Sequence, residues 1–123
     1  MSENAEALMR KARQALNDAR LLLEHDRTEA AANRAYYAAF DAARAALVTV
    51  DETPGSHAGV KTRFSYHFVR TGRLPRATAG ILAVAETMRN RADYDAFAVF
   101  ETGAAADLLA DVERFVEAAA SLL

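Results

Sequence analysis

Apolar residues recur every three or four positions along almost the whole chain, which is the spacing of one helix face, and strand-like alternation is absent. In the most apolar stretch, Tyr36, Phe40 and Leu47 share such a face, and the many alanines around them let neighbouring helices approach closely. The predicted helices span residues 3–25, 29–50, 57–69, 75–92 and 102–122. Because the links are short, we expect an all-α fold, an up-and-down antiparallel bundle of about five helices, as one domain over residues 1–123.

Polar and turn-forming residues mark the ends of these helices. Gly72 is suited to a left-handed helix end, and Pro75 to the first position of the next helix. The stretch 94–101 lacks a clear period, and we expect Phe97 and Phe100 to tuck under the bundle. The predicted N-caps of the second, third and last helices are Asp26 or Thr28, Ser56, and Thr102.

The formal net charge of −2 conceals an asymmetry along the chain. Residues 54–91 carry seven cations and one anion, whereas residues 92–123 carry one cation and seven anions. A basic middle segment favours a surface patch for an anionic partner. The alternative is that the basic and acidic segments pack side by side and neutralise each other, and the sequence leaves both interpretations open.

The composition excludes several kinds of chemistry. There is no cysteine, which rules out disulfides and thiol catalysis and is compatible with a cytoplasmic location. Residues 1–6 are acidic, and no apolar stretch approaches the roughly 20 residues that cross a bilayer, so we expect no signal peptide and no membrane partner. No glycine-rich phosphate loop follows a strand, and His57 and His67 are ten residues apart, so we expect no cofactor and no metal.

The densest group of chemically capable side chains lies at 89–95, where the sequence reads RNRADYD. A polar ridge on the otherwise apolar helix at 29–50 is the natural candidate to face it, and it consists of Asn33, Arg34, Tyr37 and Asp41. A guanidinium can stabilise negative charge that develops on phosphorus, which indicates phosphodiester chemistry or phosphate binding. The candidate catalytic residues are Arg89, Asp93 and Tyr94, and the candidate binding residues are Arg34, Tyr37, Asp41, Asn90 and Arg91.

A catalytic interpretation of this cluster lacks an obvious base. Tyrosine, with an ordinary pKa of about 10, is a poor base at neutral pH. His57 opens a predicted helix, where a capping or surface role is expected. The cluster can also be explained without any ligand, because an Arg89–Asp93 pair and the Tyr94 hydroxyl would together fasten the end of a helix.

Three separated motifs resemble those of small prokaryotic HEPN-domain proteins. They are residues 33–44 in the second predicted helix, 56–60 with 71–75 in the middle of the chain, and 89–94 at the end of the fourth helix. The resemblance covers about residues 5–120. It implies a helical bundle that forms a homodimer, with the fourth-helix motifs of the two subunits facing across a cleft. It also implies work beside a minimal nucleotidyltransferase, in two-component modules that resemble toxin–antitoxin systems.

The chain departs from the ribonuclease members of that family at the motif histidine, and it also has Asp41 where related proteins often have a histidine. Those members carry an arginine, four to six residues and then a histidine, but the positions so spaced from Arg89 are Tyr94, Asp95 and Ala96. In some members a tyrosine near the motif receives AMP from the nucleotidyltransferase, and Tyr94 is the residue here that could take that role.

We therefore expect a non-catalytic module that binds a nucleotidyltransferase, or the phosphate of a nucleotide or RNA. One alternative is a metal-independent endoribonuclease toxin, in which Asp93, Tyr94 or His57 replaces the missing base. The other is a structural subunit without catalytic activity.

Overall fold

The computed structural model describes residues 3–97 and 99–123, and over these residues the chain is helical with no strand. Its helices are α1 (Glu3–Glu24), α2 (Thr28–Val48), α3 (His57–Phe64), the π-helical segment η1 (Ser65–Val69), α4 (Arg76–Tyr94) and α5 (Thr102–Ala120). The predicted all-α bundle is confirmed. Among the described helices, none is both long enough and apolar enough to cross a membrane.

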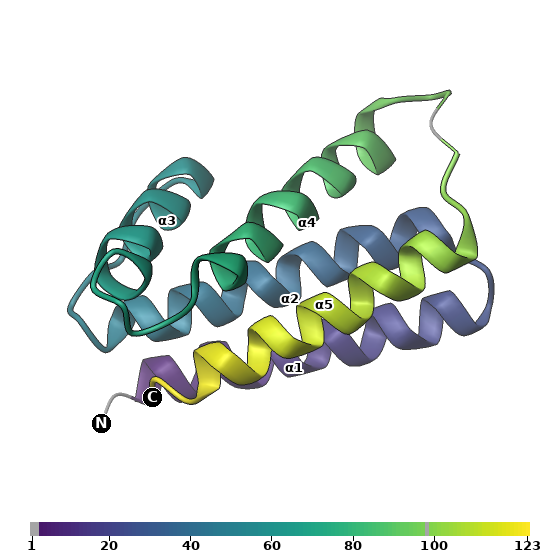
Figure 1. Cartoon of the computed structure of the whole chain (residues 1–123). Coiled ribbons are helices and arrows are strands. Elements are labelled where there is room, and N and C mark those ends of the chain that lie inside the picture. The colour runs from purple at the N-terminus through teal and green to yellow at the C-terminus, as the bar shows by residue number, and fades with distance from the viewer. Residues whose placement is uncertain (1–2, 98) are drawn as a thin grey trace.

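Helix α2 lies at the centre of the bundle and packs against α1, α3, α4 and α5. Figure 1 shows α1, α2 and α5 side by side, with α4 running obliquely across α2 and with α3 at one end. The alanines of α2 make this arrangement possible, because Ala39, Ala42 and Ala46 are completely buried and keep the neighbouring backbones close. The largest completely buried side chains between the helices are Tyr36, Phe64, Phe68 and Phe115.

The helix ends agree only partly with the sequence. The Ser56 hydroxyl accepts a hydrogen bond from the Gly59 amide at 2.9 Å, and Gly72 has a φ of 80°, so both predictions are confirmed. The N-caps predicted for α2 and α5 are wrong. Each of these helices begins at the threonine itself and has no side-chain cap.

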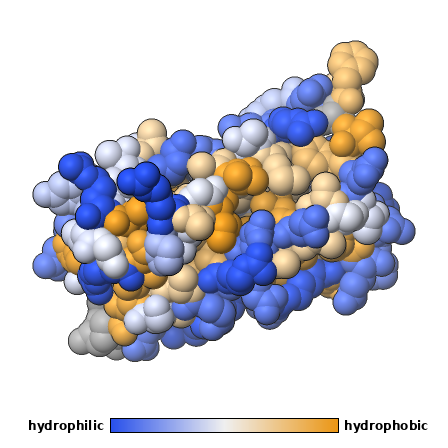
Figure 2. All heavy atoms as spheres, viewed as in Figure 1, coloured by the Kyte–Doolittle hydropathy of each residue, from blue (hydrophilic) through white to orange (hydrophobic). Residues whose placement is uncertain are grey.

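The link between α4 and α5 also differs from the prediction. Phe97 is 92 % exposed, so the expectation that it tucks under the bundle is wrong, whereas Phe100 is partly buried. This link projects from one end of the molecule, and Figure 2 shows apolar side chains at its surface. Residues 1 and 2 of the predicted domain, and residue 98 of the stretch 94–101, lie outside the described residues.

Candidate functional site

A partly buried arginine, Arg89, lies at the centre of the site. Arg89 and Asp93 are four residues apart and share one face of α4, and α4 packs on α2. The Arg89 side chain is only 12 % exposed. Its guanidinium carbon lies 5.0 Å from the ring centre of Tyr36, 5.6 Å from that of Tyr37 and 5.9 Å from that of Tyr94. The cation is therefore held mainly by aromatic rings.

Polar contacts leave this guanidinium incompletely bonded. Within the described part of the chain its one carboxylate contact is long, with 3.5 Å between Nη1 of Arg89 and Oδ2 of Asp93. The same oxygen accepts a 3.0 Å hydrogen bond from Asn33. Among the described residues, the buried Nε of Arg89 has no hydrogen-bond partner. Burial opposes the charge, but Tyr37, Asp93 and Tyr94 outweigh it and raise the pKa of Arg89, so the side chain stays cationic. A buried donor without an acceptor is uncommon in folded proteins and calls for an explanation, such as a ligand that the site binds.

A histidine lies one side chain away from Arg89. Nδ1 of His57 is 2.6 Å from the hydroxyl of the buried Tyr36, and its ring stacks on Phe40 with 4.3 Å between the centres. Burial, with a further contribution from the Glu86 carboxylate, raises the pKa of Tyr36 to about 12, although Arg89 opposes this rise. Tyr36 is therefore a neutral phenol at physiological pH. When it donates to Nδ1, the proton of the neutral imidazole is on Nε2.

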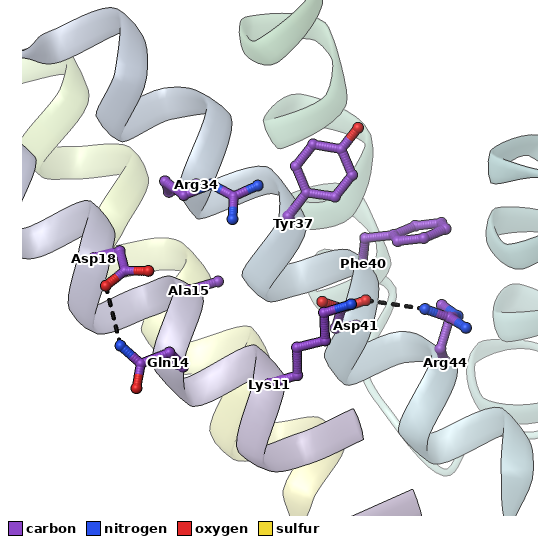
Figure 3. A pocket seen from close by; sticks show the side chains of 9 residues that line it. All are labelled: Lys11, Gln14, Ala15, Asp18, Arg34, Tyr37, Phe40, Asp41 and Arg44. Carbon is purple, nitrogen blue, oxygen red and sulfur yellow. Dashed lines mark hydrogen bonds and ion pairs between the residues drawn. The ribbon is translucent and has the colours of Figure 1, made fainter. Parts of the chain in front are cut away.

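A hollow of about 430 Å³ lies next to this cluster, between α1 and α2. Figure 3 shows Arg34, Tyr37 and Phe40 on α2, beside residues of α1 that line the same hollow. The Arg34 guanidinium carbon is 5.2 Å from the centre of the Tyr37 ring, which is also the ring that Arg89 contacts. The residues that line the hollow are Lys11, Gln14, Ala15, Asp18, Arg34, Tyr37, Phe40, Asp41 and Arg44.

The structure thus places the predicted residues in two adjoining groups. Arg89, Asp93, Tyr94 and Tyr37 come together around the guanidinium. Arg34 and Asp41 line the hollow, where the buried Asp41 pairs with Arg44 at 3.2 Å.

The other two predicted binding residues lie apart from Arg89. Asn90 is exposed, and Arg91 lies over the ring of Phe100, 5.4 Å from its centre. Over the described residues, no three His, Asp or Glu side chains are placed to hold a metal ion.

Two further residues contribute to the site, and of these only His57 had been named, as a substitute base in the ribonuclease alternative. Tyr36 follows the core stripe of α2, and its hydroxyl was the one sign that it needed a polar partner. His57 was expected in a capping or surface role, but it is only partly exposed and bonds to Tyr36.

Comparison with known proteins shows the family to which the chain belongs. Residues 5–122 match the model of the HEPN domain. The chain belongs to the HEPN-domain family. This HEPN domain is 32 % identical over 114 residues to a UPF0332 protein of Thermotoga maritima, which covers 93 % of this chain and 86 % of the relative.

Two further relatives are similar over most of the HEPN domain. One, from Methanocaldococcus jannaschii, is named "Putative toxin" and is 36 % identical over 92 residues, 75 % of this chain and 69 % of the relative. The other is a UPF0332 protein of Gloeobacter violaceus, 35 % identical over 94 residues, 76 % of this chain and 75 % of the relative.

Proposed function

We propose that this HEPN domain is a toxin-like module whose Arg89 site binds a phosphate group of a nucleotide or RNA. The observation that carries the proposal is the buried Nε of Arg89, which has no acceptor among the described residues. A guanidinium offers five donors in a planar fork that matches two oxygens of a phosphate. Here one long contact to Asp93 uses little of that capacity.

The surroundings of Arg89 suit an anion for a second reason. Asn33 donates to Asp93 at 3.0 Å, so this carboxylate is shared between two donors and competes less for Arg89. Arg34 lies over the same Tyr37 ring as Arg89 and adds a second cation near the site. Two cations near one ring favour a ligand with more than one negative charge.

The second part of the proposal concerns partners. The module would form a homodimer and act beside a minimal nucleotidyltransferase, as the HEPN resemblance implies. Two relatives have toxin in their names, which supports a toxin-like role. Tyr94 is 77 % exposed, so its hydroxyl is accessible to an enzyme that transfers a nucleotide. Phe97 and Val99, which are 92 % and 80 % exposed, would be covered in such an assembly.

Binding of a labelled RNA oligonucleotide and of ATP should be measured with the wild type, with Arg89→Met and with Arg91→Met. Arg91 serves as the control because it is exposed in the same helix and contacts Phe100. We expect Arg89→Met to weaken binding by about tenfold or more, since charge-assisted hydrogen bonds are lost. Equal affinities of the wild type and Arg89→Met would contradict the proposal. Co-purification with a nucleotidyltransferase tests the partner.

A second candidate function is a metal-independent endoribonuclease, and the position of His57 favours it. A neutral imidazole is a suitable general base when its unprotonated nitrogen is free, which here requires Tyr36 to turn its hydroxyl away from Nδ1, and His57 is joined to Arg89 through Tyr36. RNA cleavage in EDTA should then be lost in both His57→Asn and Arg89→Met, while both variants remain folded. Absence of cleavage by the wild type would contradict the ribonuclease function and leave the binding module and the structural subunit.

A further inference from the structure

The basic middle segment is not neutralised by the acidic end of the chain. Two carboxylates of α5 pair with α1 instead, with Glu117 2.5 Å from Arg13 and Glu113 2.9 Å from Arg20. Over the described residues, the one ion pair between segments 54–91 and 92–123 is the long contact within α4, at the Arg89 site. Most of the excess positive charge of residues 54–91 therefore remains available to a partner outside the domain.

Part of this charge is organised around an exposed tyrosine. Lys61, Arg63, Tyr66 and Arg70, which we call the α3–η1 basic face, line a hollow of about 550 Å³ together with two small hydroxyl residues. Tyr66 is 47 % exposed. The guanidinium carbon of Arg63 lies 4.5 Å from its ring centre and that of Arg70 lies 5.7 Å from it. One exposed ring thus positions two arginines.

The first of these arginines is held rigidly. Nε of Arg63 donates to both carboxylate oxygens of Glu52 at 2.8 Å, and Glu52 also pairs with His67. Hydrogen bonds from Arg63 and His67 lower the pKa of Glu52 to about 2, so Glu52 is ionised at neutral pH and its pairing with Arg63 is intact. Because the guanidinium is already fixed, the Arg63 side chain loses less conformational entropy when a ligand stacks against it.

The second arginine is free to bind an anion. Over the part of the chain that the structure describes, no carboxylate pairs with Arg70, whereas Lys61 is bonded to Glu86 at 2.6 Å. The face therefore combines a fixed guanidinium, an aromatic ring and an unpaired cation. A π-helical turn, such as η1 here, occurs often at functional sites.

We propose that the α3–η1 basic face binds a single-stranded nucleic acid, at a surface separate from the Arg89 site. Unpaired bases stack on aromatic rings and on guanidinium planes, and phosphates pair with nearby cations. A duplex hides the faces of its bases within its own stack and cannot use the Tyr66–arginine platform. An acidic peptide without aromatic residues would match the charge but has no flat rings to stack on this platform.

The test is fluorescence anisotropy of a labelled single-stranded RNA of about 12 nucleotides with the full chain at fixed salt, a length within the site sizes of single-strand binders. We expect Tyr66→Ala and Arg70→Gln each to weaken binding by about fivefold or more, because a stacked base or a phosphate contact is lost. Tyr66→Phe keeps the ring and should retain affinity. Arg114→Gln removes an exposed charge from α5 and should have little effect.

Three outcomes would overturn the proposal. The first is unchanged affinity in Tyr66→Ala. The second is equal affinity for a duplex of the same length, and the third is equally effective competition by polyglutamate, which would assign the face to an acidic protein. Repeating the titration in the Arg89→Met background separates the two sites, since sensitivity to Tyr66 should persist there. Thermal melts of each variant check that it is folded.

Discussion

Replacement of Arg89 by methionine should leave the stability of the domain nearly unchanged. The Arg89 side chain is 12 % exposed, and its guanidinium lies among Tyr36, Tyr37 and Tyr94. The substitution keeps most of the apolar stem and removes the guanidinium. If the cluster existed to fasten a helix end, the same change would be strongly destabilising. The free energy of unfolding therefore distinguishes a ligand site from a structural bridge.

The magnitude follows from opposing contributions. The cation–π contacts of Arg89 with three rings contribute about 1–2 kcal/mol in total. The 3.5 Å contact with Asp93 adds about 0.5 kcal/mol. Against these stands the buried, unbonded Nε, whose lost hydration costs about 1–3 kcal/mol. Asp93 keeps its hydrogen bond from Asn33 after the change. The net change should lie within about 1.5 kcal/mol of zero.

Urea unfolding followed by far-UV circular dichroism measures this difference, at one fixed protein concentration because a homodimer would make stability concentration-dependent. Arg91→Met, at an exposed position, should change the free energy of unfolding by less than about 0.5 kcal/mol. A saturating phosphate ligand, at about 100 times its Kd, should stabilise the wild type by about 2.7 kcal/mol and Arg89→Met far less. A loss of about 3 kcal/mol or more in Arg89→Met without ligand would refute this reasoning and indicate a structural bridge.

Two other substitutions test the local structure. Glu52 has a pKa lowered to about 2, so its bonds to Arg63 and His67 contribute fully above its unfolded pKa of about 4.5 and weaken as the pH falls toward 2. Glu52→Gln should therefore lower the melting temperature at neutral pH, with the difference from wild type narrowing in acid; a constant difference would contradict this. Ser56→Ala removes the cap of α3 and should cost about 1 kcal/mol in urea unfolding, whereas Thr102→Ala, at a helix start without a side-chain cap, should cost less than about 0.5 kcal/mol.

The helices could be predicted because burial of one face imposes its period on the sequence, and the predicted stripes correspond to the observed helices. Caps were harder, since a polar residue near a helix start can either cap it or lie inside its first turn, as Thr28 and Thr102 do. The error at Phe97 has another cause. An apolar side chain shows that burial is favourable, but the sequence does not show whether its partner lies in the same chain.

The part of the candidate site that lies on one helix could be predicted, and the part that depends on packing between helices could not. Arg89 and Asp93 are neighbours on one helix, and their pairing follows from spacing alone. The contact of Tyr36 with His57 joins residues 21 positions apart, and it depends on how α3 packs beside α2. Neither residue has a local pattern that indicates the other. The sequence also did not show whether the acidic end would neutralise the basic middle segment. That outcome depends on the packing of α5 on α1, where carboxylates of α5 pair with arginines of α1.

Adjacent tyrosines on α2 link the two groups of polar residues. Neighbouring positions on an α-helix point about 100° apart, so Tyr36 turns inward to His57 while Tyr37 turns toward the hollow between α1 and α2. Arg89 contacts both rings, and Arg34 contacts the second. An anion that draws Arg34 away from Tyr37 changes the surroundings of the ring that also holds Arg89. Binding at the hollow and binding at Arg89 therefore act on a shared side chain and should not be independent.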